Sequence, residues 1–172
     1  TAVEDEASSP NLMLDDAATI DLTGLTGQLT ATFSVHREAA LSNTVGFYIT
    51  DTADGGIIDA LTGGTLTPGD AGYKEAALAK QLNVQLSGEN DQVKTFDASI
   101  DSGVFLGTFV VIDGVDPAVG EVFFSHQGAN SDGFDHIRQL GDNTFGIEDQ
   151  SGGGDLDFND TVVSFKIEAA IA

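Results

Sequence analysis

Short segments in which apolar and polar residues alternate recur along the chain, and they limit the folds open to it. Leu29–His36 and Thr161–Glu168 place apolar side chains on one face and polar side chains on the other, and Asn43–Thr50 repeats the pattern. Such alternation predicts half-buried β-strands. Gly103–Ile112 is apolar at most positions, which predicts a strand that is either buried on both faces or bent at Gly107-Thr108. These segments predict a mainly β protein.

Turn residues separate these segments. The chain has 21 glycines, many beside Asn or Asp, and it shows no repeat of fixed period. One helix is predicted at about 71–82, with Asp70 as its N-cap. Gly46 lies inside a predicted strand, where a bulge or a close neighbour would favour glycine. Further short strands are predicted at 18–22, 83–86, 92–96, 121–125, 134–140 and 144–147. We expect an antiparallel β-sandwich of jelly-roll type with one short helix.

Length predicts one domain. We expect residues 1–16, which are small, acidic and turn-rich, to form a linker or N-terminal extension, and residues 17–172 to form a single β-sandwich domain. The chain begins without Met and carries no signal peptide, transmembrane run or lipidation motif. We therefore expect an excised piece of a larger protein or a processed product. The domain is expected to be monomeric within a larger chain.

Composition excludes several functions. The chain has 28 acidic and 6 basic residues, a formal charge of −22, which has the wrong sign for binding nucleic acid or anionic membrane. Hydrophobic residues make up 41% of the chain, so a core is available and disorder is not expected. The absence of Cys excludes disulfides and thiolate metal sites. Packing and bound ions remain as sources of stability.

The densest group of acids lies in Glu148–Asp160. Three consecutive glycines, Gly152–Gly154, separate two acidic groups, and no basic residue lies inside the stretch. Crowded carboxylates repel one another and must stay in water, become protonated or share a cation. Oxygen donors at this density suit Ca²⁺. The predicted calcium ligands are Glu148, Asp149, Asp155, Asp157, Asn159 and Asp160.

Known calcium loops do not fit this stretch. Counting from Asp155, an EF-hand needs Gly at the sixth position and Glu at the twelfth, where this chain has Asp160 and Lys166. The glycine-rich nonapeptide of calcium-loaded β-helices is present in one imperfect copy, too few to bury a core. What remains is a split site, with acids at the end of one strand and at the start of the next. In an extended segment, Asp160 would project away from Asn159 and the two aspartates before it.

A second pair of acids, Asp51 and Asp54, lies beside Gly55 and Gly56. It is either a weaker ion site or a solvated turn.

Several longer motifs resemble a known family. They are Asn130–Arg138, Asn143–Asp149 and Gly152–Val163, with Asn43–Tyr48 and Pro68–Tyr73 upstream. Together they resemble a domain of unknown function that recurs in cyanobacterial surface proteins and in large repeats-in-toxin (RTX) adhesins, including their peptide-binding domains. The chain departs from that pattern at Gln150-Ser151, where Leu-Pro is frequent, and at Thr161, where a branched apolar residue is usual.

The resemblance implies a secreted, extracellular or cell-surface, calcium-dependent β-sandwich that takes part in cell adhesion. In this interpretation the domain recognises peptide or protein ends, or a glycan, on another cell surface. The expected ligand-binding residues are the backbone amides of Gly152, Gly153 and Gly154, which form an anion nest. Asn130, Asp132 and Asp135 are expected on the same rim.

Three other functions compete with this interpretation. A calcium-stiffened structural spacer would bind nothing else. A calcium-dependent carbohydrate-binding module is less favoured, because the chain has no Trp and only Tyr48 and Tyr73 for stacking. An enzyme is not expected: there is no nucleophile elbow, and adjacent Asp135 and His136 would face opposite sides of a strand.

Overall fold

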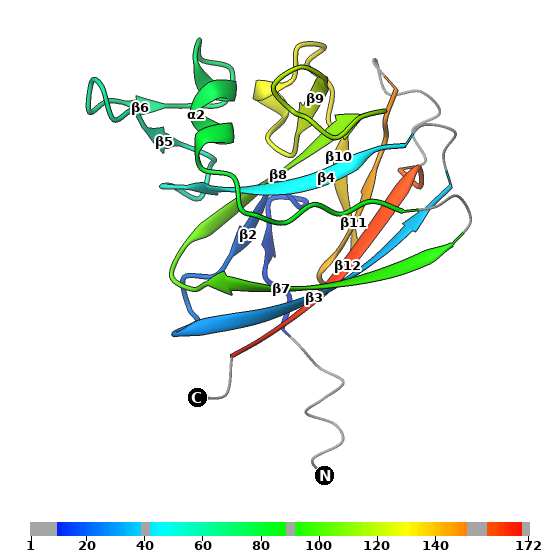
Figure 1. Ribbon diagram of the computed structural model, residues 1–172. Coiled ribbons are helices and arrows are strands. Elements are labelled where there is room, and N and C mark those ends of the chain that lie inside the picture. Colours follow the sequence, from blue (N-terminus) through cyan, green and yellow to red (C-terminus); the bar gives the residue numbers. More distant parts are fainter. Residues whose placement is uncertain (1–9, 39–41, 89–91, 151–157, 170–172) are drawn as a thin grey trace.

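The computed structural model describes residues 10–38, 42–88, 92–150 and 158–169. Two five-stranded antiparallel sheets face each other, and a two-stranded ribbon and a helix project at one end (Figure 1). The first sheet has the order β1-β2-β8-β4, with β9 also paired to β8, and the second has the order β10-β11-β12-β3-β7. Within these residues, the predicted antiparallel β-sandwich with one short α-helix is confirmed.

The strands of the first sheet are β1 (Met13–Leu14), β2 (Thr19–Asp21), β4 (Thr44–Thr50), β8 (Phe105–Ile112) and β9 (Glu121–Phe124). Those of the second are β3 (Gln28–Arg37), β7 (Val93–Asp101), β10 (Ile137–Gly141), β11 (Thr144–Ile147) and β12 (Thr161–Ala169). The projecting ribbon and the helices are β5 (Ile57–Ile58), β6 (Thr65–Leu66), α2 (Tyr73–Ala79) and the 3₁₀ turn η1 (Gln127–Ala129).

The centre of the second sheet pairs strands that are far apart in sequence. Strand β12 runs antiparallel to β3 over nine residues, with Phe165 opposite Phe33. The alternation predicted for both strands is present, since Leu29, Ala31, Phe33 and Val35 are all buried. This pairing determines the position of β12, including its first residue Thr161, which lies opposite Arg37.

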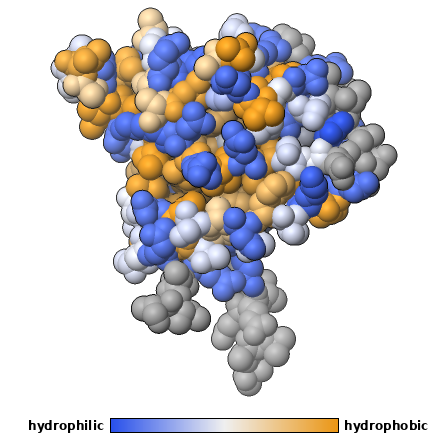
Figure 2. Space-filling model, viewed as in Figure 1, coloured by the Kyte–Doolittle hydropathy of each residue, from blue (hydrophilic) through white to orange (hydrophobic). Residues whose placement is uncertain are grey.

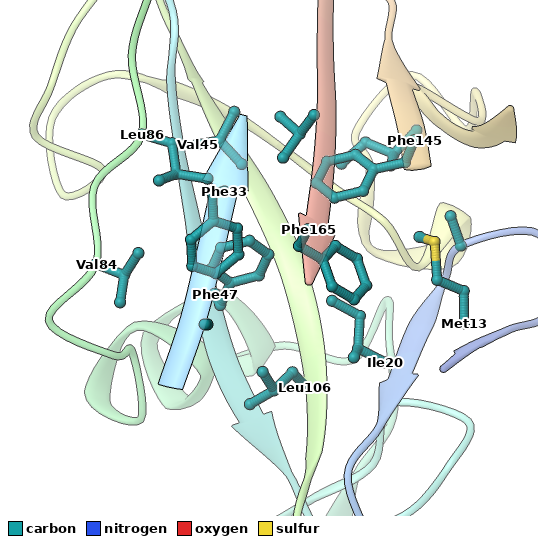
Figure 3. Close-up of a cluster of buried hydrophobic side chains, with 14 of the residues drawn as sticks. Met13, Ile20, Phe33, Val45, Phe47, Val84, Leu86, Leu106, Phe145 and Phe165 are labelled. Atoms are coloured by element: carbon teal, nitrogen blue, oxygen red, sulfur yellow. The ribbon is translucent and has the colours of Figure 1, made fainter. Parts of the chain in front are cut away.

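The core lies between the two sheets. Phe33 of one sheet stacks on Phe47 of the other with ring centroids 5.3 Å apart, and Phe165 and Phe145 lie beside them (Figure 3). Burial of such side chains, each contributing about 1.5–3 kcal/mol, is the main source of stability. Six consecutive residues of β8, from Leu106 to Val111, are buried, as expected for a strand covered on both faces.

Gly46 confirms the expectation of a close neighbour. A Cβ atom at this position would overlap the ring of Phe109, which packs across β4 from the paired strand β8. Glycine is therefore required here by packing.

A second apolar cluster supports the projecting end. It centres on Tyr48 and Tyr73, whose hydroxyls lie 3.0 Å apart, and the Tyr73 hydroxyl donates to the Gly55 carbonyl at 2.7 Å. Burial raises the pKa of Tyr48 well above its ordinary value, and the neighbouring Tyr73 adds a smaller contribution in the same direction. The tip remains apolar on its surface, where Ile58 and Leu61 are exposed (Figure 2).

Some boundaries differ from those predicted. Helix α2 is shorter than expected, and its N-cap is Gly72 rather than Asp70, because the Asp70 carboxylate accepts hydrogen bonds from the amide and hydroxyl of Thr67 instead. Segment 83–86 contributes a single bridge between Leu86 and Val45, not a strand. Strand β7 runs on to Asp101, and β10 begins only at Ile137.

The expected linker also contributes to the fold. Of residues 1–16 the structure describes 10–16, where Met13 and Leu14 form β1 and Met13 is buried in the core. The Asn143 side chain holds this segment, since its Oδ1 accepts from the Leu12 amide at 2.7 Å and its Nδ2 donates to the Pro10 carbonyl at 2.9 Å.

Candidate metal centre

Two strand ends bring together three of the predicted calcium ligands. Strands β11 and β12 pair antiparallel with Ile147 opposite Thr161. The residues that follow β11, Glu148 and Asp149, therefore lie beside Asp160, which precedes β12. The Asp149 amide donates to Asp160 Oδ2 at 2.8 Å, which ties the two ends together.

Glu148, Asp149 and Asp160 form what we call the carboxylate cluster. One carboxylate oxygen from each lies within 4.8 Å of the others. Glu148 and Asp149 are only 1% and 5% exposed, and Asp160 is half-buried. In the described part of the chain, no ion pair joins Asp149 or Asp160 to a basic side chain. Negative charge is thus concentrated where water screens it poorly.

The electrostatics of Asp149 reflect this crowding. Burial raises the pKa of its carboxyl, and the nearby charge of Asp160 raises it further, while the hydrogen bond from Asn43 opposes both effects. Ionisation of Asp149 is therefore less favourable than that of an exposed aspartate. A divalent cation shared by the three carboxylates would reverse that penalty.

Asn43 holds Asp149 in place from the other sheet. Its side chain is 2% exposed and uses both ends: Nδ2 donates to Asp149 Oδ2 at 2.7 Å, and Oδ1 accepts from the Asp113 amide at 2.9 Å. This residue immediately precedes β4. No local pattern marked it, because its partner is 106 positions away.

His136 supports Glu148 in a similar way. The Glu148 amide donates to the His136 carbonyl at 2.9 Å, and His136 Nδ1 lies 2.7 Å from the Glu148 carbonyl. On its other side, Nε2 lies 2.7 Å from Asp132 Oδ2. The buried ring stacks on Phe123 at 3.6 Å. Both ring nitrogens therefore face oxygen atoms. His136 thus has a packing and hydrogen-bonding role.

The remaining predicted ligands are distributed differently. Asn159 is half-buried and adjacent to Asp160 in sequence. Gly152, Gly153, Gly154, Asp155 and Asp157 lie outside the described residues.

The three residues predicted for the ligand rim have partners of their own. Asn130 is buried, and its side chain bonds the backbone of Phe124 at both N–H and carbonyl, and the carbonyl of Phe134. Asp132 bonds His136, as described above. Asp135 accepts from Arg138 Nε at 3.1 Å and lines a separate hollow described below.

The second predicted pair of acids lies in the turn that leads to β5. Asp51 Oδ2 accepts from the Ile58 amide at 2.7 Å and from Lys80 Nζ at 3.1 Å. Asp54 accepts from the Thr52 hydroxyl. These two acids are engaged by separate donors.

The fold and the cluster define an all-β domain with a buried group of acids where one strand ends and the last begins. The chain belongs to the family described as Domain of unknown function (DUF4114), whose model matches residues 79–168, more than half of the 172-residue chain. The match includes the carboxylate cluster, whereas the upstream motifs at 43–48 and 68–73 lie outside it. No curated protein and no solved structure matches the chain. Among the described residues, no helix is long and apolar enough to cross a membrane.

Proposed function

We propose that the domain binds Ca²⁺ through Glu148, Asp149 and Asp160 and that, with calcium bound, it recognises a ligand for a secreted bacterial adhesin. One observation carries the metal proposal: three carboxylates, two of them buried, approach within 4.8 Å of one another. Keeping such charges together without a cation is costly, because burial removes the water that would screen them.

The donor chemistry favours calcium over other cations. All three donors are carboxylate oxygens, and the chain contains no Cys. Ca²⁺ takes 6–8 oxygens in flexible geometry, whereas Mg²⁺ demands a tighter octahedron and keeps several waters. Asp155, Asp157 and Asn159 are proposed to supply further oxygens from the segment that leads into β12.

The proposed ligand is a free peptide or protein end on a partner surface. A carboxylate ligand suits a calcium ion beside the Gly152–Gly154 amides, because both attract negative charge. The resemblance to RTX adhesins and cyanobacterial surface proteins supports an extracellular, non-enzymatic role in adhesion.

A structural spacer is the second candidate, favoured by the position of the cluster. The carboxylate cluster joins the end of β11 to the start of β12, so a bound ion would also clamp these strands. A carbohydrate-binding module is disfavoured, since both Tyr48 and Tyr73 are buried and neither offers a stacking surface.

Calorimetry tests the proposal in two stages. Calcium is titrated into metal-free protein, and then a short peptide with a free C-terminus is titrated into the calcium-loaded protein, with its C-terminally amidated form as control. We expect heat from calcium and a preference for the free carboxylate. No binding of calcium would overturn the metal site. Calcium binding without peptide binding would favour the spacer, and equal affinity for both peptides would remove the carboxylate-capture mechanism.

A further inference from the structure

A second group of acids lines a hollow of about 250 Å³ formed by residues from five parts of the chain. Four aspartates line it, Asp15, Asp16, Asp54 and Asp135, together with His126. We call this the acid hollow. Asp15 and Asp16 belong to the tight turn between β1 and β2, where three successive residues have left-handed backbone angles. None of its residues belongs to the carboxylate cluster.

His126 contributes an acceptor to the hollow that does not depend on the aspartates. Its side chain is 7% exposed, and Nε2 lies 3.3 Å from the Thr19 hydroxyl. That hydroxyl donates its proton to the Ala53 carbonyl at 2.7 Å, so it can only accept from His126. Nε2 therefore carries the proton, and Nδ1 is a bare acceptor. In the described part of the chain, Nδ1 has no hydrogen-bond partner.

The histidine ring is held in this position by close packing. A Cβ atom on Gly55 would lie 2.7 Å from the ring's Cδ2. Burial lowers the pKa of His126, and the charges of Asp54 and Asp15 oppose that effect, which places both carboxylates near the ring. A buried, neutral imidazole beside two carboxylates presents only acceptors to the hollow.

The donors that line the hollow are engaged elsewhere. The Ser125 hydroxyl donates to the Ala18 carbonyl at 2.8 Å, and Gln127 Nε2 donates to the Gly133 carbonyl at 2.8 Å. Asp135 is paired with Arg138, while the Asp15 side chain has no hydrogen-bond partner among the described residues. Two acceptors of the hollow, the Asp15 carboxylate and His126 Nδ1, therefore lack a donor among the described residues, whereas Asp16 accepts from the Gln139 amide and Asp54 from the Thr52 hydroxyl.

The spacing of these acceptors argues against a bare metal ion. Within the described residues, the one group of three or more acidic or histidine side chains whose ligand atoms approach within 4.8 Å is the carboxylate cluster. The acceptors of the hollow are spread more widely. An organic cation has a larger radius and several N–H donors that can reach separate acceptors.

We propose that the acid hollow binds an organic cation with several N–H donors, an ammonium or guanidinium group such as those of lysine and arginine side chains. The cation would donate to the carboxylates of Asp15 and Asp54 and to His126 Nδ1. Ring and aliphatic surface from His126, Ala18 and Pro68 would contact its alkyl stem.

The test is an NMR titration of amide resonances with n-butylammonium and n-butylguanidinium, at constant ionic strength and with excess calcium present. Tetramethylammonium, which has the charge but no N–H, is the chemical control. We expect saturable shifts at residues near 15–18, 53–55 and 125–128, with a dissociation constant of roughly millimolar size for so small a ligand. The tighter probe identifies which group the hollow prefers.

Two double variants separate the hollow from general surface charge. Asp15→Asn with Asp54→Asn removes two acceptors and should weaken binding at least fivefold. Asp97→Asn with Asp101→Asn removes the same charge from exposed positions on β7 and should leave binding unchanged. His126→Gln should weaken binding without changing net charge.

Equal weakening by both double variants, or equal shifts with tetramethylammonium, would overturn the proposal, as would the absence of saturable shifts. Because the hollow and the carboxylate cluster share no residue, failure of calcium binding would leave this result unaffected.

Discussion

Two acid-rich regions of the molecule differ in the hydrogen-bond donors that face their carboxylates and in the direction of the carboxyl pKa shifts. In the turn before β5, Asp51 accepts from the Ile58 amide and from Lys80, and Asp54 accepts from Thr52. The Ile58 amide, helped by Lys80, lowers the pKa of Asp51, and the Thr52 hydroxyl lowers that of Asp54. In the carboxylate cluster, burial raises the pKa of Asp149 despite its bond from Asn43.

Under the calcium proposal, the donors available to a group of carboxylates, and not the number of acids in it, decide whether the group needs a cation. The exposed turn supplies donors from its own backbone, from the Thr52 hydroxyl and from Lys80, so Asp51 and Asp54 each accept a hydrogen bond within the turn or from the C-cap of α2. In the carboxylate cluster, Asp149 lies beside Asp160. The side-chain donor to Asp149 is the neutral amide of Asn43, which carries no compensating charge. Each of the following experiments changes one side of this contrast.

The largest effect is expected from closing the space between β11 and the segment that enters β12. A Cβ atom on Gly146 would overlap the Phe158 carbonyl oxygen, which is backbone and cannot rotate away. We expect Gly146→Ala to destabilise the domain by about 3 kcal/mol in chemical denaturation and to weaken calcium binding, because Asp160 would move with Phe158. Gly141→Ala, where the nearest side-chain atom is 4.0 Å away, should have a much smaller effect. Equal losses from the two variants would mean that the position of Asp160 does not depend on this approach.

A smaller loss is expected from removing the amide that holds Asp149. Asn43→Ala leaves Asp149 Oδ2 and the Asp113 amide without the hydrogen bonds that Asn43 makes to them, and lost buried hydrogen bonds cost about 2 kcal/mol. We expect this loss in denaturant unfolding, together with weaker calcium binding measured by calorimetry. Asn83→Ala, at an exposed position, should change stability by less than about 0.5 kcal/mol. Unchanged calcium affinity in Asn43→Ala would show that Asp149 needs no support from the first sheet.

The smallest effect is expected in the exposed turn. Because the folded-state pKa of Asp51 is lowered, its charge stabilises the fold above the ordinary aspartate pKa of 3.8, and that contribution is lost as the pH falls through the lowered value. Water screens this partly exposed pair, so Asp51→Asn should cost less than about 1 kcal/mol at pH 7. The difference from wild type should shrink in thermal melts below pH 3.8. A difference that grows on acidification would contradict this account of the turn.

Strands are predicted well from the sequence where the spacing of apolar residues matches the positions that the fold buries. The alternation in β3 and β12 and the apolar run in β8 each identify a strand and its buried positions. Prediction was less accurate where a side chain bonds to nearby backbone instead of following the expected pattern. Asp70 bonds Thr67 rather than capping α2, and Asp132 Oδ1 accepts from the Phe134 amide at 3.0 Å, which holds this segment in a turn before β10.

In the candidate site, too, some residues can be predicted from the sequence and others cannot. The acids of Glu148–Asp160 are adjacent in sequence, so their density alone indicates a cation site. Asn43, which fixes Asp149, and the four aspartates of the acid hollow come together only through strand pairing and turns distant in sequence. No spacing rule reveals such contacts from one sequence.

The central claim is that the carboxylate cluster lacks only a cation, and melting temperatures of wild type and Asp149→Asn in calcium and in EGTA test it most directly. Calcium at 100 times its dissociation constant should stabilise wild type by about 2.7 kcal/mol, or roughly 5–10 °C for a domain of this size. Asp149→Asn removes the repulsion and a ligand, so it should melt at or above wild type in EGTA and respond little to calcium. Identical melting of wild type with and without EGTA would contradict the claim.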